Sequence, residues 1–351
     1  MRDTYTKTLI VRFSSVGDIV LSSLLVRVFR RRFPHAQIDY LVKAEFAGLV
    51  RVNPNISRVI ELPAGATFSD LRNIRKRILA GRYDLIVDIH DSLRSRYISL
   101  GARRVVRIRK RKLARFFLVH LKWNVYAFFG GAPGVAERYL EPVQPLGVTN
   151  DGEGLEMFLE ERDHEKAETF LRTSKVSPEA AIIGIAPSAK HANKQWPSDR
   201  FAETALALLR DPQTTCILLG SAEERERCTA IMERVLSAAP DARIINAAGS
   251  LSLTEAAALM DRCSLVLSND SGLMHIAAAR KRKVVALFGP TVRQFGFFPY
   301  GTDSIVLERS GLECRPCTHI GRSSCPKRHF RCLEDIEPDH VLKSVEQFLR
   351  Q

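Results

Sequence analysis

The chain alternates short apolar runs with helix-length segments, and it does so twice. In the first half the expected strands are Thr8–Phe13, Ile38–Val42, Arg58–Leu62, Asp84–Ile89 and Arg104–Ile108. In the second half they are Ala181–Ala186, Thr215–Leu219, Arg243–Asn246, Ser264–Leu267 and Val284–Phe288. A Gly- and Pro-containing break at residues 130–134 and polar sequence at 150–154 separate the halves. This alternation favours an α/β protein with two doubly wound parallel sheets.

A length of 351 residues suits two domains, which we place at residues 1–155 and 156–351. The clearest helical patterns are Ile19–Phe33, Phe68–Ala80 and a closing helix at Pro338–Gln351. Ligands of parallel sheets bind beyond the carboxyl ends of the strands. We therefore look for chemistry in the loops at those ends, and we expect the ligand in a central cleft faced by both domains.

The net charge of +14 is concentrated in the first half of the chain. Residues 1–150 hold 27 Lys/Arg and 11 Asp/Glu, whereas the remainder holds 26 and 28. Such an excess indicates a polyanionic partner for the first domain. The N-terminus does not resemble a signal peptide, and no run of 18 uncharged apolar residues occurs. We predict a cytoplasmic protein that is at most peripheral to the inner face of the membrane.

One turn in the second half has the composition of a phosphate site. Ser268–Ala279 follows an apolar strand and opens a small-residue helix, whose first N–H groups are free to bind an anion. The candidate residues for binding a nucleotide diphosphate are Asp270, Ser271, Gly272 and His275. An ordinary capped helix with a core histidine is the alternative.

Three further loops follow predicted strands. Asp18 opens the first helix, where it could cap that helix or act as a general base. The loop at 186–197 offers Ser188, Lys190 and Lys194, which could neutralise a diphosphate or simply face solvent. Glu223 could accept hydrogen bonds from a ribose or begin a helix. No GxGxxG follows the first strand of either half and no GxxxxGK[ST] occurs, so dinucleotide and P-loop sites are disfavoured.

Residues 92–136 contain no acidic side chain. Aromatic residues follow the cations, a combination typical of segments that meet anionic lipid. Nucleic acid would be attracted too, but no binding motif supports it, and a core helix with solvated arginines is a further alternative. The predicted membrane or acceptor surface comprises Arg103, Arg104, Arg107, Arg109, Lys110, Arg111, Lys112 and Arg115.

Four of the seven cysteines cluster near the end of the chain, at Cys314, Cys317, Cys325 and Cys332. Their spacing permits a structural zinc site. Reduced thiols or a labile disulfide are favoured over zinc, and no catalytic metal is expected.

Taken in order, these segments resemble the lipopolysaccharide heptosyltransferases, glycosyltransferase family nine. The resemblance rests on Leu9–Leu21, on the Pro187–Pro197 loop that ends in Trp-Pro, on Asp270–His275, which matches Asp-[Ser/Thr]-Gly-x-x-His, and on Phe288–Thr291. It implies a GT-B fold with two Rossmann-like domains, binding the acceptor in the first and the nucleotide sugar in the second. The cysteine-bearing segment resembles the heptosyltransferase II branch. Ser188 and Gln195 depart from the Gly and Arg common in relatives.

The resemblance implies metal-independent, inverting transfer of heptose from ADP-heptose to an anionic, lipid-linked inner-core acceptor. In this assignment Asp18 is the base, Lys194 meets the diphosphate and Glu223 holds the ribose. Asp270, Ser271, Gly272 and His275 form the phosphate and sugar end of the site. The alternatives are a transferase of the same family with another donor or acceptor, and a non-enzymatic basic protein that binds membranes or nucleic acid.

Overall fold

The computed structural model describes residues 5–129 and 131–350, and they form two compact units. The first unit comprises residues 1–110 and 133–158, and the second comprises residues 111–132 and 159–351. The predicted boundary at 155/156 and the contact boundary at 158/159 differ by a few residues. The larger difference is residues 111–132, which group with the second unit although they interrupt the first.

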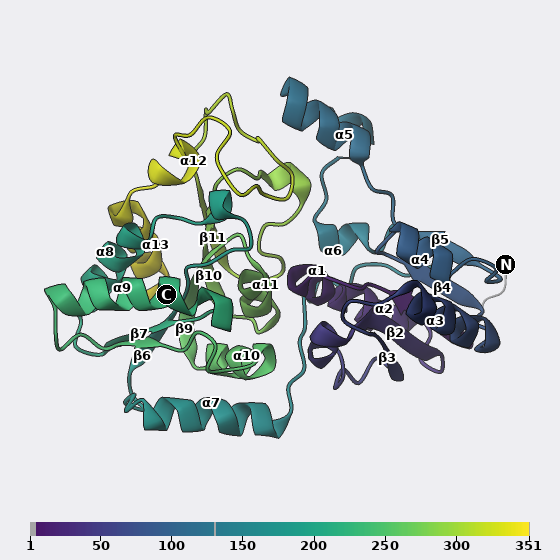
Figure 1. Cartoon of the computed structure of the whole chain (residues 1–351), viewed down its shortest axis with the longest axis horizontal. Helices are drawn as coiled ribbons and strands as arrows, with labels where there is room; N and C mark the ends of the chain where they lie inside the picture. Colours follow the sequence, from purple (N-terminus) through teal and green to yellow (C-terminus); the bar gives the residue numbers. More distant parts are fainter. Residues whose placement is uncertain (1–4, 130, 351) are drawn as a thin grey trace. The chain divides into compact units, whose positions relative to one another are not determined.

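The first unit contains a five-stranded parallel sheet in the order β3-β2-β1-β4-β5 (Figure 1). Its strands are β1 (Lys7–Val11), β2 (Gln37–Lys43), β3 (Arg58–Leu62), β4 (Leu85–Asp88) and β5 (Val105–Arg107). Helices α3 (Phe68–Ala80) and α4 (Leu93–Ile98) bury Leu71, Ile74 and Ile98 in one core against the sheet. The remaining elements are α1 (Val16–Leu21), α2 (Ser23–Arg32), α6 (Val135–Arg138) and the 3₁₀ turns Ala44–Leu49 and Gln144–Leu146.

The second unit contains a six-stranded sheet in the order β11-β10-β9-β6-β7-β8. Its strands are β6 (Ala181–Ala186), β7 (Thr214–Leu218), β8 (Ile244–Asn246), β9 (Cys263–Asn269), β10 (Lys283–Phe288) and β11 (Ser304–Glu308). Among the described residues the strand pairings of both sheets are parallel, which confirms the predicted α/β class and the doubly wound sheets. The sixth strand, β11, was not predicted.

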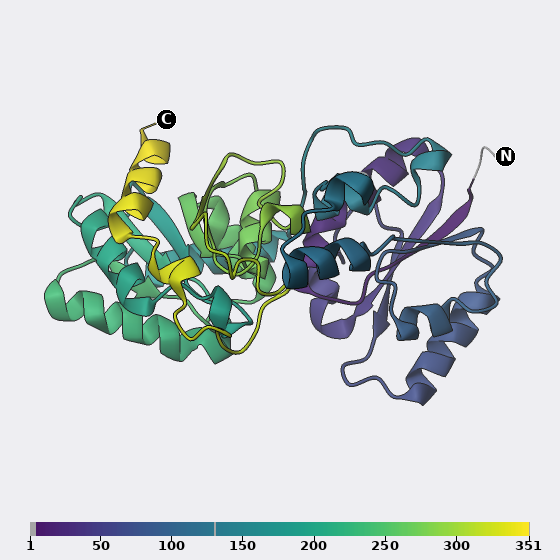
Figure 2. The same ribbon diagram turned by 90° about the horizontal axis from the view of Figure 1, so that it is seen from above.

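Helices cover the second sheet through apolar faces. Helices α8 (Ser198–Leu208), α9 (Arg225–Ala238) and α13 (Pro338–Leu349) share one buried core with strand residues. In Figure 2 the chain ends at α13, the yellow helix. The other helices are α7 (Glu161–Thr173), α10 (Leu253–Asp261), α11 (Gly272–Ala279) and α12 (Arg331–Glu334), with 3₁₀ turns at Ala192–Lys194, Ala222–Glu224 and Arg293–Phe295.

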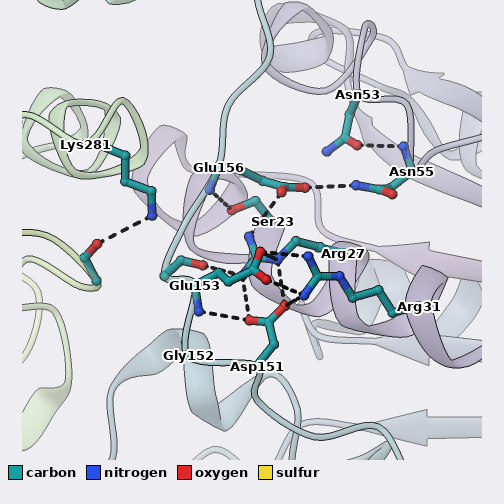
Figure 3. Close-up of polar contacts among 12 residues, drawn as sticks. Ser23, Arg27, Arg31, Asn53, Asn55, Asp151, Gly152, Glu153, Glu156 and Lys281 are labelled. Carbon is teal, nitrogen blue, oxygen red and sulfur yellow. Dashed lines mark hydrogen bonds and ion pairs between the residues drawn. The ribbon is translucent and has the colours of Figure 1, made fainter.

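A buried arginine ties the end of the first unit to α2 (Figure 3). Arg27 donates from Nε and Nη2 to the two Asp151 oxygens, both at 2.9 Å, and from Nη1 to Glu156 at 3.1 Å. Its Nη2 also donates to the Gly154 carbonyl at 2.7 Å. A buried guanidinium is tolerated only when its donors are paired, as they are here. The segment that leads out of the first unit is therefore firmly attached to it.

Candidate active site

Asp18 lies in the loop-to-helix turn that follows β1. It is the third residue of α1, and Ser15 is the N-cap of that helix. The Asp18 Oδ1 atom pairs with Arg12 Nη2 at 2.7 Å and accepts a hydrogen bond from the Tyr139 hydroxyl at 2.9 Å. Oδ2 accepts from the Ser15 backbone N–H at 3.3 Å and from its hydroxyl at 3.1 Å. Asp18 thus contributes to capping α1 while its carboxylate stays partly exposed.

Cations and a neutral histidine gather around this end of the first sheet. Lys43 ends β2, His90 follows β4, and Lys110 Nζ donates to the Asp91 carbonyl at 2.6 Å. Burial, and then the charges of Arg12 and Lys110, lower the pKa of His90 to about 3. The imidazole is therefore neutral at physiological pH, and the end of the sheet offers both hydrogen-bonding groups and positive charge.

On the second unit, Lys194 and Asp270 form a buried ion pair. Lys194 Nζ lies 2.6 Å from Asp270 Oδ2, and the Thr291 hydroxyl donates to the same oxygen at 2.8 Å. Ser271 is the N-cap of α11 and Gly272 is its first residue. The cation therefore lies next to a helix start, where unpaired backbone N–H groups also favour an anion.

The predicted donor loop supplies a further donor. The Ser188 hydroxyl is buried and has no hydrogen-bond partner among the described residues, which fits a group that awaits a ligand. The Pro187 carbonyl accepts from Asn269 at 2.7 Å and from Arg227 at 3.0 Å, which fixes the start of the loop. Lys190, in the same loop, is exposed.

The other two predicted donor residues lie on neighbouring elements. Glu223 is exposed in the 3₁₀ turn that follows β7. His275 is buried on α11, with its ring centroid 6.4 Å from that of Phe297. The predicted residues divide between the units: Asp18 belongs to the first, and the donor-binding residues belong to the second, where Lys194 and Asp270 contact each other.

The cysteine-bearing loop supports the donor loop through Asn193. The Arg322 N–H donates to Asn193 Oδ1 at 2.8 Å, and Asn193 N–H donates to the Arg322 carbonyl at 3.3 Å. Asn193 Nδ2 also lies 3.9 Å from Cys317 Sγ. Gly321 has a φ of +124° and sits so close to His191 that a Cβ there would meet the imidazole at 2.5 Å. Glycine is required at this contact, which holds the loop beside Lys194.

The four clustered cysteines are reduced in the structure. Cys314 Sγ lies 3.7 Å from His329 Nε2. Burial would raise the pKa of Cys325, but backbone N–H groups of residues 327–330 outweigh it and lower that pKa. Within the described ranges, no three His, Cys, Asp or Glu side chains are arranged to hold a metal ion.

The predicted basic surface is divided between the two units at residue 110. Arg103, Arg104, Arg107, Arg109 and Lys110 belong to the first unit, where Arg107 approaches buried Asp88 at 3.5 Å. Arg111, Lys112 and Arg115 belong to the second unit. Arg111 directly precedes a strap that contains Lys112 and Arg115. We define the strap as residues 112–129: α5 (Lys112–Phe116), a π-helical turn (Phe117–Leu121) and a 3₁₀ turn (Tyr126–Phe129).

The strap packs on the loop that carries Thr291. Ala114, Leu118 and Tyr126 form a small core with Phe295. Lys122 Nζ donates to the Pro316 carbonyl at 2.6 Å and the Cys314 carbonyl at 3.2 Å. The outward side chains are large and apolar: Trp123 is 62% exposed and Phe128 is 86% exposed, and Leu113, Phe116 and Leu121 are exposed as well. The predicted core-helix alternative thus holds for a minority of the segment only.

Sequence reasoning missed Arg12, Tyr139, Thr291 and Asn193. Arg12 directly follows the apolar run Leu9–Val11, and a charge at a strand end was an available signal. Tyr139 and Thr291 had none, because their contacts with Asp18 and Asp270 join residues that are distant in the chain.

Two doubly wound parallel-sheet units, with a carboxylate beyond a strand end of one and a cation beside a helix start on the other, form the arrangement expected of the GT-B fold. A family model described as glycosyltransferase family 9 (heptosyltransferase) matches residues 71–327, and the chain belongs to that family.

Individual relatives and solved structures indicate which branch of the family the chain resembles. The chain is 28% identical to lipopolysaccharide heptosyltransferase 2 of Escherichia coli, covering 98% of this chain and 99% of the relative. It is 30% identical to lipooligosaccharide heptosyltransferase 2 of Haemophilus influenzae, covering 97% and 99%. The solved E. coli ADP-heptose LPS heptosyltransferase II matches with a TM-score of 0.71 at 25% identity, covering 99% of both chains.

The family and branch predicted from the sequence are therefore confirmed, as is the GT-B fold. The chain is a glycosyltransferase of lipopolysaccharide synthesis rather than a non-enzymatic binding protein. Among the described residues no helix is long and apolar enough to cross a bilayer.

Proposed function

We propose that this enzyme transfers a heptosyl group from ADP-heptose to a heptose of the lipopolysaccharide inner core, with inversion at the anomeric carbon. The observation that carries the proposal is the Lys194–Asp270 pair at the start of α11, with the buried Ser188 hydroxyl on the adjoining loop. A cation, a helix start and an unpaired hydroxyl together suit a nucleoside diphosphate. The relatives named heptosyltransferase 2 favour the second heptose-transfer step.

The chemistry is an in-line displacement. Asp18 takes the proton from an acceptor hydroxyl as that oxygen forms its bond to the anomeric carbon of the donor. The bond from the anomeric carbon to the phosphate oxygen breaks on the opposite face, and ADP leaves with the electron pair. Asp18 must deprotonate the acceptor hydroxyl that attacks the same donor molecule whose diphosphate Lys194 binds, and no metal is needed.

The leaving diphosphate accumulates negative charge, which preorganised donors stabilise. We assign this task to Lys194, the Ser188 hydroxyl and the first N–H groups of α11, with exposed Lys190 at the edge of the site. Glu223 accepts hydrogen bonds from the ribose. Ser271 and Gly272 set the turn, and His275 contributes to the sugar end.

Measurement of transferred mass tests this function. Purified enzyme is incubated with ADP-heptose, ADP-glucose, UDP-glucose and GDP-mannose, each with lipopolysaccharide acceptors truncated to zero, one or two heptoses. The proposal predicts addition of one heptosyl residue from ADP-heptose, on the acceptor that already carries one heptose. Transfer from another nucleotide sugar would identify a different transferase of the same family, and transfer to the heptose-free acceptor would assign the first step.

The strap, together with the basic residues around it, is proposed to meet the anionic cytoplasmic face of the inner membrane, where the lipid-linked acceptor lies. Exposed Trp123 and Phe128 would enter the interface, and Lys112 and Arg115 would meet anionic headgroups. Each cation near such a surface contributes about 1 kcal/mol. Nucleic acid is not a proposed partner.

Sedimentation with phosphatidylglycerol vesicles checks this surface. Binding should fall steeply between low and high salt, because surface charges are screened beyond about 10 Å at 0.1 M salt. Trp123→Ser combined with Phe128→Ser should weaken binding further, whereas Phe68→Ser, an exposed aromatic residue on the first unit, serves as the matched control. Binding that is indifferent to both salt and the strap variants would contradict the proposal.

A further inference from the structure

The two oxygens of the Asp18 carboxylate are held differently. Oδ1 is bound by the Arg12 guanidinium at 2.7 Å and the Tyr139 hydroxyl at 2.9 Å. Among the described residues, Oδ2 has only the longer contacts to the Ser15 N–H and hydroxyl, at 3.3 and 3.1 Å. A sugar hydroxyl could replace the Ser15 hydroxyl at Oδ2 without disturbing the contacts of Oδ1.

Arg12 is itself fixed in place. Its Nη1 atom donates to the Ile89 carbonyl at 2.8 Å, so the guanidinium joins the end of β1 to the end of β4. The Tyr139 ring lies 5.5 Å from the Arg12 guanidinium carbon. This side chain therefore has one orientation, in which its Nη2 reaches Asp18.

The positive charge of Arg12 helps to keep the Asp18 carboxyl ionised. Burial alone would raise the pKa of Asp18, but the charge of Arg12 and hydrogen bonds from Tyr139 and Ser15 outweigh it and hold that pKa below its ordinary value. The groups that couple electrostatically to Asp18 are Arg12, Tyr139, Tyr40 and His90. Burial raises the pKa of both tyrosines and lowers that of His90, so these three are neutral at pH 7 and Arg12 supplies the charge.

Building on the proposed function, we propose that Arg12 is a positioning residue for the general base: it keeps Asp18 ionised in a half-buried setting and leaves Oδ2 as the oxygen that accepts the acceptor proton. The proton passes from the acceptor hydroxyl to Oδ2, and Oδ1 remains bound to Arg12 and Tyr139 throughout. Tyr139 assists in orienting the carboxylate.

Removal of the Arg12 charge provides the test. In Arg12→Gln the carboxyl of Asp18 should titrate about 1 to 3 pH units higher than in the wild type, the usual effect of a neighbouring opposite charge. The acidic limb of kcat/KM should move upward by the same amount, because that limb reports the free base. Arg12→Lys keeps the charge and should restore most of the wild-type limb.

Carboxyl titration is followed by ¹³C NMR of aspartate-labelled protein, with the Asp18 signal assigned from Asp18→Asn. This measurement needs no turnover. It therefore tests the role of Arg12 even if the transfer assay shows that ADP-heptose is not the donor. If Arg12→Gln does not fold, Tyr139→Phe supplies the test, with a smaller upward shift expected.

Arg58→Gln is the matched control. Arg58 pairs with Asp39 at 2.7 Å, the same distance as Arg12–Asp18, but outside the site. It should leave both the Asp18 titration and the acidic limb unchanged. An unshifted Asp18 midpoint in Arg12→Gln, or an equal shift in Arg58→Gln, would overturn the assignment.

Discussion

Two ion pairs at strand ends, one on each unit, join a cation to a carboxylate, and the more exposed partner is the carboxylate in one pair and the cation in the other. In Arg12–Asp18 the carboxylate is the more exposed partner, at 18% against 12%. In Lys194–Asp270 the cation is the more exposed partner, at 11% against 6%. We infer that in each pair the more exposed partner works on the substrate and the more buried one positions it.

The surroundings of the two pairs agree with this division. Donors from Arg12 and Tyr139 surround Asp18 and stabilise its negative charge. The Thr291 hydroxyl and Lys194 bind the same Asp270 oxygen, while the Ser188 hydroxyl and the start of α11 lie on adjoining segments. The proposed roles therefore rest on the neighbouring groups and the relative exposure as well as on the ion pairs themselves.

The largest expected effect is on the first pair. Asp18→Asn should reduce kcat about 10²- to 10⁴-fold, the contribution of a general base. Initial rates at saturating donor and acceptor measure this effect. Asp151→Asn, which removes the carboxylate from the Arg27 network, should lower stability without reducing kcat to a similar extent. Equal losses of kcat in both variants would end the distinction between a working and a structural carboxylate.

The second pair should respond in donor-site affinity. Lys194→Met removes a charged hydrogen-bond donor and should raise the Kd for ADP about 10- to 100-fold. It also leaves Asp270 buried without its cation, at a typical cost of about 3–5 kcal/mol of stability. The double variant Lys194→Met/Asp270→Asn should recover stability but not ADP affinity. Recovery of both, measured by calorimetry, would make the pair purely structural.

A smaller effect is expected one residue earlier in the loop. Asn193→Ala loses the contacts with Arg322 and Cys317 and should weaken ADP binding about fivefold, equivalent to roughly 1 kcal/mol for a lost hydrogen bond. Asn53→Ala removes another buried asparagine, on the first unit, and serves as the control. If the two variants bind ADP equally well, the cysteine-bearing loop does not position Lys194.

A separate effect is expected on stability near Asp18 rather than on donor binding. The pKa of His90 is about 3 in the folded protein and near 6.5 when unfolded, so the unfolded chain binds the proton first as pH falls. Stability is therefore lost on lowering the pH below about 6.5, by up to about 2 kcal/mol at pH 5. His90→Gln should flatten this decline in thermal unfolding experiments, and an unchanged decline would mean that other groups cause it.

Much of the fold was predictable because strand signals are local. All ten predicted strands lie where the structure has strands, and Phe68–Ala80 was predicted with the bounds of α3. The segment Ile19–Phe33 is instead split at Ser22, whose hydroxyl contacts the Ile19 carbonyl and Tyr40 at 2.7 Å each. β11 was missed because it ends in a charge and is exposed in part, so its apolar run is only Ile305–Leu307.

The site was predictable as a set of strand-end residues but not as a set of pairs. Asp18, Lys194 and Asp270 follow strands in the sequence, which is a local pattern. Their partners Arg12, Tyr139 and Thr291 act through tertiary contacts, and the Tyr139–Asp18 bond spans 121 residues. The placement of the strap on the second unit also depends on the distant contact between Leu118 and Phe295.

The central claim is that the first unit provides the base and the second unit binds the donor. Titration of ADP into Asp18→Ala tests this claim most directly. The account predicts a Kd for ADP within about twofold of the wild type, in a variant that no longer transfers heptose, because Asp18 makes no contribution to holding the leaving group. A Kd weakened to the level of Lys194→Met would contradict it, since Asp18 would then belong to the donor site rather than provide the base.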